Sequence, residues 1–224
     1  MAGLADLSVP LQDYLREIYK LQAGSERVRT TALAQRMGVK PPSATAMVKK
    51  LAARGLVDHR PYYGVRLTRR GERLALEALR HHRLLELYLA RTLELGLDAV
   101  HAEADRLEHA LSETLEEQID RVLGSPTEDP HGDPIPDPTL RIVHAKERLL
   151  TELQPGERAT VRRVPDRDDE VLRYLAELTL LPGQEVEVVR TEPLGGPVTL
   201  RAAGRPVAIS QQLAAEIGVS ELAS

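Results

Sequence analysis

The chain has no cysteine, no phenylalanine and no tryptophan among its 224 residues. Without cysteine it can form no disulfide, no zinc finger of the cysteine type and no thiol nucleophile. Its aromatic content is limited to six tyrosines, although 42% of the residues are hydrophobic. We therefore expect hydrophobic cores built from Leu, Val, Ala and Ile.

Long hydrophobic runs are also missing. No stretch approaches the ~18 apolar residues that a membrane-spanning helix needs. The N-terminus lacks the basic segment followed by an apolar one that marks a signal peptide. We expect a cytoplasmic protein with no membrane partner.

Charge is distributed unevenly, although the net charge is only −4. Residues 1–75 hold 14 Lys and Arg against 6 Asp and Glu, a net charge of +8, whereas residues 76–145 hold 6 against 15, a net charge of −9. Residues 146–224 hold 10 against 13. A basic N-terminal third favours a polyanionic partner, and an acidic middle favours cations.

The first third has the pattern of a winged helix-turn-helix. Apolar spacing predicts helices over 8–23, 30–38 and 39–55, followed by a β-hairpin within 56–68. In this motif the helix after the turn enters the major groove of double-stranded DNA, and basic residues of the hairpin meet phosphates. The alternative is a helical domain whose basic face binds nothing. The predicted DNA-binding residues are Lys40, Pro42, Ser43, Thr45, Lys49, Lys50, Arg60 and Arg66.

The remaining patterns predict a mainly α protein with a small β domain. Leucines at helical spacing indicate a long helix over 68–95 and one or two helices over 97–123, whose apolar faces would pair with a second copy of the chain. A proline-rich linker and a short helix precede a region of period 2, which predicts a small β-barrel with one helix. The predicted domains are 1–75 (winged helix), 76–140 (helical), 141–155 (linker helix) and 156–224 (β-barrel).

The segment HAEADRLEHALSE, residues 101–113, mixes imidazoles with carboxylates. On one continuous helix, His101, Asp105, Glu108 and His109 would lie within an arc of about 100°. Such side chains hold divalent metal ions, although a solvated acidic stripe with two incidental histidines is the alternative. One arc cannot surround an ion, so other helices must contribute ligands.

Further ligands are available on the two earlier helices, and they divide the candidates into two sites. One site would join Asp13 of the first helix to Asp105, Glu108 and His109. The other would join His82 and Glu86, one turn apart on the long helix, to His101. A further histidine, His131 in PHGDPIP, is expected to pack in a turn rather than to bind metal.

These features together resemble the diphtheria-toxin-repressor family of metal-dependent transcriptional regulators. The resemblance rests on the winged helix, H-x-x-x-E at 82–86, the E-H pair at 108–109 and PHGDPIP, and it extends over essentially the whole chain. It implies a primary metal site at the Asp13 set, an ancillary site at the His82 set and a C-terminal SH3-like domain. It also implies a homodimer, a palindromic operator and repression of metal-uptake genes.

Departures from the family pattern bear on the metal. Iron-type members have Met on the first helix and Cys before E-H, where this chain has Asp13 and Asp105 and so resembles the manganese type. Manganese-type members carry a further Glu where this chain has Arg16, which puts a paired two-metal site in doubt. Iron-type members also take ancillary ligands from the third domain, where Asp168, Asp169 and Glu170 are loosely placed candidates.

We therefore expect a repressor activated by Mn²⁺ or, second, by Fe²⁺, with Co²⁺, Zn²⁺ and Cd²⁺ able to bind in vitro. The protein is not expected to be an enzyme. Two alternatives remain at the level of sequence: a winged-helix regulator that senses an organic ligand, and a metallohydrolase. The second lacks a glycine-rich phosphate loop and a G-x-S-x-G motif, and it would leave the winged helix without a role.

Overall fold

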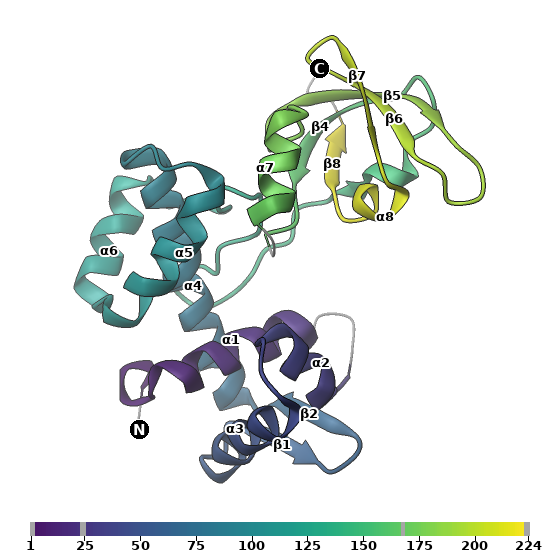
Figure 1. The fold of residues 1–224 in the computed structure, drawn as a ribbon. Helices are drawn as coiled ribbons and strands as arrows, with labels where there is room; N and C mark the ends of the chain where they lie inside the picture. Colours follow the sequence, from purple (N-terminus) through teal and green to yellow (C-terminus); the bar gives the residue numbers. More distant parts are fainter. Residues whose placement is uncertain (1–2, 23–25, 167–168, 222–224) are drawn as a thin grey trace. The chain divides into compact units, whose positions relative to one another are not determined.

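The computed structural model describes residues 3–22, 26–166 and 169–221 (Figure 1). The chain divides into two compact units, and neither is continuous in sequence. The first comprises Met1–Arg83, Asp105–Gln118 and Pro136–Ile142, and the second comprises Leu84–Ala104, Ile119–Ile135 and Val143–Ser224. The long helix α4 (Arg69–Thr92) runs through the division.

The first unit contains the predicted winged helix. A short 3-10 turn η1 (Leu4–Asp6) leads into α1 (Val9–Gln22), and α2 (Thr30–Arg36) and α3 (Pro41–Ala53) follow. Two prolines open α3, where a missing backbone N–H costs little. Leucine, isoleucine and valine side chains from these helices form one core with the hairpin that follows, including Leu15, Ile18, Leu33, Val48 and Leu51.

The hairpin consists of β1 (Val57–Arg60) and β2 (Gly64–Leu67), antiparallel with Val57 opposite Leu67 and Arg60 opposite Gly64. Gly64 has φ +106°, and a Cβ atom there would lie 2.4 Å from the carbonyl oxygen of Val28. Backbone bonds in both directions between Val28 and Val65 fix that close approach. The wing is therefore attached to the segment that precedes α2.

The predicted helix through residue 109 is interrupted. Helix α5 (Leu97–Leu107) ends before Glu108, and a 3-10 turn η2 (Glu108–Ala110) follows it. The next helix, α6 (Glu113–Val122), begins after Ser112, whose hydroxyl accepts a hydrogen bond from the N–H of Leu115. Because Ser112 caps a new helix, the expectation of one continuous helical arc is wrong for Glu108 and His109.

The C-terminal part of the second unit is an antiparallel sheet of six strands in the order β3-β8-β4-β5-β6-β7. Alternating apolar side chains of the strands and of α7 form its core, including Val161, Leu172, Val188, Leu200 and Val219. The alternation agrees with the predicted small β domain. Its elements are β3 (Arg148–Leu149), η3 (Leu150–Glu152), β4 (Arg158–Arg163), α7 (Asp169–Glu177), β5 (Glu185–Thr191), β6 (Val198–Ala202), β7 (Arg205–Ile209), α8 (Gln211–Ala214) and β8 (Gly218–Glu221).

The linker helix predicted over 141–155 is wrong. Residues 142–147 have no regular structure, and the chain then forms β3 and the 3-10 turn η3. Arg148 and Leu149 pair with β8, and the N–H of Leu150 donates to the carbonyl of Ile217. Pairing with a distant strand therefore overrides the local helical spacing.

Among the described residues, no helix is both long enough and apolar enough to cross a membrane.

Candidate metal centre

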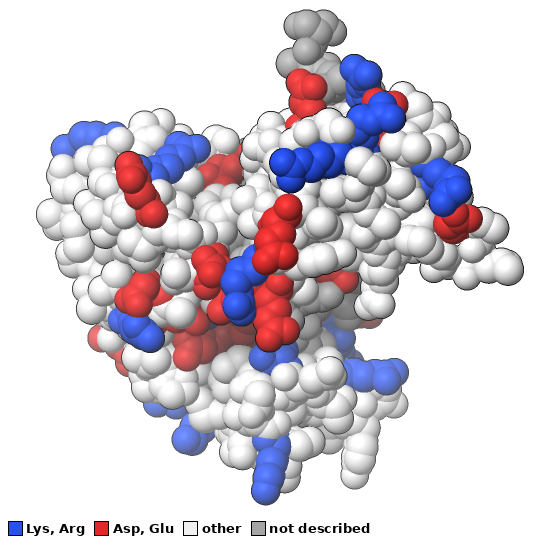
Figure 2. Space-filling model, turned by 45° about the horizontal axis from the view of Figure 1, so that its top comes forward, with Lys and Arg blue, Asp and Glu red and all other residues white. Residues whose placement is uncertain are grey.

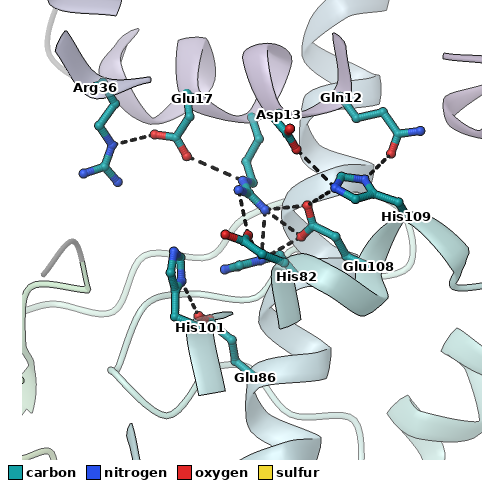
Figure 3. Close-up of polar contacts among 11 residues, drawn as sticks. Gln12, Asp13, Glu17, Arg36, His82, Glu86, His101, Glu108 and His109 are labelled. Carbon is teal, nitrogen blue, oxygen red and sulfur yellow. Dashed lines mark hydrogen bonds and ion pairs between the residues drawn. The ribbon is translucent and has the colours of Figure 1, made fainter. Parts of the chain in front are cut away.

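The first unit brings together three of the four residues predicted for the primary site. Asp13 comes from α1, and Glu108 and His109 come from the η2 turn; their ligand atoms lie within 4.8 Å of one another. The Nε2 atom of His109 is 3.3 Å from Oδ1 of Asp13 and 3.4 Å from Oε1 of Glu108 (Figure 3). Ligand atoms about 2.1 Å from one ion lie roughly 3.0–3.5 Å apart at octahedral to tetrahedral angles. This group, called here the first centre, has the dimensions of a cation site.

A residue that the sequence did not single out orients His109. Gln12 is buried, and its side-chain N–H₂ donates to the carbonyls of Leu4 and Leu7 at 3.1 and 3.0 Å. Its carbonyl oxygen Oε1 therefore points to Nδ1 of His109 at 2.9 Å, so that Nδ1–H donates. Nε2 then presents its lone pair to Asp13 and Glu108. Metal-binding histidines usually donate their second nitrogen in this manner.

Without a cation, the ionised form of Asp13 is disfavoured by its surroundings in the first centre. Burial raises the pKa of Asp13, and the neighbouring Glu108 and Asp105 add to that rise, while Arg16 and His109 oppose it. A divalent cation would replace this repulsion by direct attraction. The donor set of two carboxylates and one correctly oriented imidazole therefore fits a metal ion.

Asp105, the fourth predicted residue, belongs to a neighbouring group. Its Oδ1 atom lies 3.3 Å from Nδ1 of His82, and that nitrogen lies 2.6 Å from Oε2 of Glu108. His82, Asp105 and Glu108 are also close enough to hold a cation, and they share Glu108 with the first centre. His82, which we predicted for the other site, thus faces the primary set through Nδ1.

A cation already occupies this neighbouring group: the guanidinium of Arg16. Its NH1 atom is 2.6 Å from both oxygens of Glu108 and 2.9 Å from Nδ1 of His82, and NH2 is 3.0 Å from Asp105 (Figure 3). Nδ1 of His82 can either donate to Glu108 or accept from Arg16, since it carries a proton or a lone pair but not both. Although burial alone would lower it, the pKa of Arg16 is raised by Glu108 and Asp105.

Arg16 also connects this region to the helix-turn-helix. Its Nε atom lies 3.5 Å from Oε1 of Glu17, and Oε2 of Glu17 accepts a hydrogen bond of 2.6 Å from Nε of Arg36 at the end of α2. Burial alone would raise the pKa of Glu17, but Lys20 and Arg36 together lower it. Glu17 is therefore a buried carboxylate that stays ionised to a lower pH than an ordinary glutamate.

The second unit contains a further group of candidate ligands around Glu86. Oε1 of Glu86 lies 2.9 Å from Nδ1 of His101, so two of the three residues predicted for the ancillary site are in contact. His82 precedes Glu86 by one turn of α4 but belongs to the first unit. Glu86 also lies near Asp129 and His131, and all three side chains are buried.

His131 is the candidate ligand that sequence reasoning placed in a turn. It does lie in a turn, because Oδ1 of Asp129 accepts from the N–H groups of His131 and Asp133. However, both ring nitrogens are buried without a hydrogen-bond partner. Nδ1 lies 3.9 Å from an oxygen of Glu86 and from one of Asp129, too far for hydrogen bonds but suitable for a bridging cation. Burial of both nitrogens in this way is not visible in the sequence.

Of the three third-domain candidates, the structure describes Asp169 and Glu170. Asp168 lies outside the described residues. Asp169 and Glu170 are exposed in the first turn of α7. Within the described part of the chain, neither belongs to a group with the spacing of a cation site.

The predicted DNA-binding residues lie on the surface of the first unit. Lys40, Pro42, Ser43, Lys49 and Lys50 are exposed on α3 or just before it, and Arg60 and Arg66 are exposed on the hairpin. Thr45 is half-buried, and its hydroxyl donates to the carbonyl of Pro41 within the same helix. Five of these residues carry positive charge, as contact with phosphates requires.

Two features moderate the basic character of this surface. Asp58 of β1 lies 3.8 Å from Arg60 and 3.5 Å from Arg66, and Arg27 lowers the pKa of Asp58 through a hydrogen bond. On the face of the molecule drawn in Figure 2, Lys and Arg side chains lie apart from one another with uncharged surface between them. DNA contacts would therefore depend on individual side chains of α3 and the wing.

Comparison of the sequence with known families gives three adjoining matches. Residues 6–65 match the description "Iron dependent repressor, N-terminal DNA binding domain". Residues 68–137 match "Iron dependent repressor, metal binding and dimerisation domain", and residues 148–221 match the FeoA domain. The first centre draws Asp13 from the first match and Glu108 and His109 from the second.

Individual relatives align over nearly the whole chain. The iron-dependent repressor IdeR of Mycobacterium leprae is 29% identical over 97% of this chain and 99% of its own length. The diphtheria toxin repressor of Corynebacterium diphtheriae is 27% identical over 98% of this chain and 100% of its own length. Among solved structures, a manganese-dependent transcriptional repressor in complex with manganese has a TM-score of 0.86 at 38% identity, covering 95% of this chain and 100% of the other.

Proposed function

Because this chain belongs to the iron-dependent repressor family of metal-dependent transcriptional regulators, we propose that it represses metal-uptake genes by binding their operators when its first centre holds Mn²⁺ or Fe²⁺. The protein is a DNA-binding repressor and not an enzyme. It would act in the cytoplasm, where the DNA is.

One observation carries the proposal: the first centre joins a helix of the DNA-binding domain to a turn far away in the sequence. Gln12 and His109, which meet at this centre, are separated by 97 residues. An ion held by Asp13, Glu108 and His109 would fix α1 against η2, and α1 packs against both α2 and α3. Metal binding would then select one arrangement of the helix-turn-helix.

The metal preference follows from the donor atoms. The first centre offers carboxylate oxygens and one imidazole nitrogen, and the sequence has no cysteine to add a thiolate. Oxygen-rich sites suit Mn²⁺ and accept Fe²⁺, whereas Zn²⁺ and Cu²⁺ gain more from softer or fewer ligands. We propose Mn²⁺ as the physiological activator, with Fe²⁺ second.

A second, supporting site would lie around Glu86 in the second unit. His101 contacts Glu86 directly. Nδ1 of His131 is buried without a hydrogen-bond partner and lies 3.9 Å from an oxygen of Glu86 and from one of Asp129. We propose this set as the ancillary site.

The partners proposed are a palindromic operator and a second copy of the chain. A symmetric dimer reads half-sites about one helical turn of DNA apart, which is why its operator has two-fold symmetry. The matched dimerisation domain supports the dimer. So do Leu107 and Leu115 in the first unit, whose side chains are exposed and would be covered by a partner.

The test uses a 30-base-pair duplex selected from a random pool by the Mn²⁺-loaded protein. Its affinity is measured by fluorescence anisotropy against Mn²⁺, Fe²⁺ and Zn²⁺ titrations and with chelator. We expect tight binding with Mn²⁺, weaker activation by the other ions and loss of binding with chelator. His109→Ala should abolish the response, whereas His144→Ala, a change at an exposed histidine outside both sites, should not. Equal affinity with metal and with chelator would refute the proposal.

A comparison of variants tests which of the two sites is the primary one. Glu108→Ala and His109→Ala should raise the Mn²⁺ concentration for half-maximal DNA binding more than Glu86→Ala does. The opposite order would mean that the site around Glu86 is the controlling one.

A further inference from the structure

We propose that Arg16, Glu17 and Arg36 form a charged relay that carries metal occupancy of the first centre to α2, the first helix of the helix-turn-helix. The inference rests on the proposed function, because it concerns how metal binding reaches the DNA-binding elements. Figure 3 labels Glu17 and Arg36, and a dashed line joins their side chains.

The relay begins at Oε1 of Glu108, which both Arg16 and His109 approach. Its Oε1 atom is 2.6 Å from NH1 of Arg16 and 3.4 Å from Nε2 of His109. A cation in the first centre would take the lone pair of this oxygen and place two positive charges beside the guanidinium. Because the site is buried, solvent screens the two charges weakly, and the bound cation would repel the guanidinium of Arg16 away from Glu108.

Arg16 has a defined position to move to. Its Nε atom is buried without a hydrogen-bond partner, and it lies 3.5 Å from Oε1 of Glu17. An ordinary N–H···O hydrogen bond has a donor–acceptor distance of about 2.9–3.0 Å, so a shift of roughly half an ångström would complete this bond. The same shift would lengthen the contacts of NH1 with Glu108.

Glu17 passes the change to α2. Its Oε2 atom accepts a hydrogen bond of 2.6 Å from Nε of Arg36, and only 9% of its side chain is exposed. One carboxylate thus holds two guanidinium groups, one from the metal-binding region and one from the last residue of α2. When Arg16 approaches Oε1 of Glu17, the negative charge on Oε2 that attracts Arg36 decreases, and the geometry of the Glu17–Arg36 ion pair changes. The position of α2 against α1 would therefore respond to the metal.

A purely structural role for the Glu17–Arg36 ion pair makes a different prediction. A structural pair would affect DNA binding equally with and without metal. A relay affects the ratio of the two affinities, which is the coupling between metal and DNA. By thermodynamic reciprocity, DNA must raise the affinity for Mn²⁺ by the same factor by which Mn²⁺ raises the affinity for DNA.

The experiment compares Arg36→Gln with Arg54→Gln in the full-length protein. Both changes remove one positive charge from the helix-turn-helix. Arg54, just after α3, hydrogen-bonds to the backbone carbonyl of Lys50 and does not contact Glu17. DNA affinity is measured on the selected duplex with Mn²⁺ and with chelator, and Mn²⁺ affinity is measured by calorimetry with and without the duplex.

We expect Arg54→Gln to weaken DNA binding by one factor in both conditions and to leave the coupling unchanged. Arg36→Gln should keep the Mn²⁺ affinity of the DNA-free protein within about two-fold but reduce the coupling at least about five-fold, and by the same factor in both directions. Arg36→Lys, which keeps the charge, should restore part of the coupling. Glu17→Gln should lose the coupling as Arg36→Gln does, with circular dichroism confirming that the variant is folded.

The outcomes separate the relay from the proposed function. If the unmodified protein binds the duplex equally with Mn²⁺ and with chelator, metal control itself is refuted. If the unmodified protein shows coupling and Arg36→Gln retains it as Arg54→Gln does, the relay is refuted and metal control stands.

Discussion

Gln12 offers the sharpest test of how the first centre is organised. Its carbonyl oxygen accepts from Nδ1–H of His109 at 2.9 Å, while its N–H₂ group donates to the carbonyls of Leu4 and Leu7. Gln12→Met removes all three hydrogen bonds at nearly constant volume. Gln12→Glu keeps an acceptor for His109 but removes both donors.

The two variants should differ in metal affinity, and both should lose stability. Both leave the buried carbonyl of Leu7 without its side-chain donor, which should cost about 1–3 kcal/mol of unfolding free energy. Loss of the partner that orients a metal-binding histidine typically lowers metal affinity 10–100-fold, or about 1.4–2.7 kcal/mol, and we expect this for Gln12→Met. Gln12→Glu should bind Mn²⁺ at least as tightly as the parent, because a carboxylate that accepts from Nδ1–H makes the Nε2 atom of His109 a stronger metal ligand.

The assays are Mn²⁺ calorimetry on the DNA-free protein and urea unfolding with chelator. The difference between the variants isolates the orientation of His109 from the general loss of stability. Equal losses of Mn²⁺ affinity in Gln12→Met and Gln12→Glu would refute the idea that Gln12 sets the tautomer of His109.

Three further predictions concern stability and DNA binding. Burial alone would raise the pKa of Glu116, but hydrogen bonds from His81 and Arg80 lower it below 4.5. The stabilising effect of the ionised Glu116 should therefore be complete above pH 4.5 and lost as the pH falls through the lowered pKa. Glu116→Gln should flatten the dependence of the unfolding free energy on pH in that acidic range. The neighbouring Glu77 and Glu113 face the same cluster, and the variant Glu77→Gln controls for their repulsion. Arg66→Gln should reduce the log–log salt slope of DNA binding by about 0.9, the value for one phosphate contact, and an unchanged slope would exclude Arg66 from the interface. Gly64→Ala should lower the melting temperature more than Gly38→Ala. Both glycines have positive φ, but of the two only Gly64 has a backbone oxygen within 3 Å of the added Cβ. Equal decreases in melting temperature would show that the strain of a positive φ alone sets the loss of stability.

Much of the fold could be predicted because local patterns decide it. The helices of the winged motif follow from apolar spacing and from glycine and proline near their ends, and the strands from β4 to β7 follow from alternation. The elements that could not be predicted depend on partners far away in the sequence. Neither β3 nor β8 has a local signal, since each is set by pairing with strands far away in the sequence.

The candidate site shows the same division. Asp13, Glu108 and His109 could be proposed from residue type and approximate helical position, even though the last two lie on a 3-10 turn. Arg16 was identified only as a departure from a pattern, because its approach to Glu108, Asp105 and His82 depends on how α1 packs against α4 and η2. Gln12 carried no signal, since glutamines that orient a histidine differ from others only in three dimensions. The buried ring nitrogens of His131 depend equally on tertiary packing.

The discontinuous make-up of the first unit has a consequence for synthesis on the ribosome. The unit needs residues 105–118 in addition to its first 83, with a segment of the second unit between them. A nascent chain that exposes only the helix-turn-helix therefore has Asp13 but neither Glu108 nor His109. During translation the DNA-binding part therefore precedes two of the three residues proposed to hold the metal ion, and a chain released early would carry α3 and the wing without the proposed first centre.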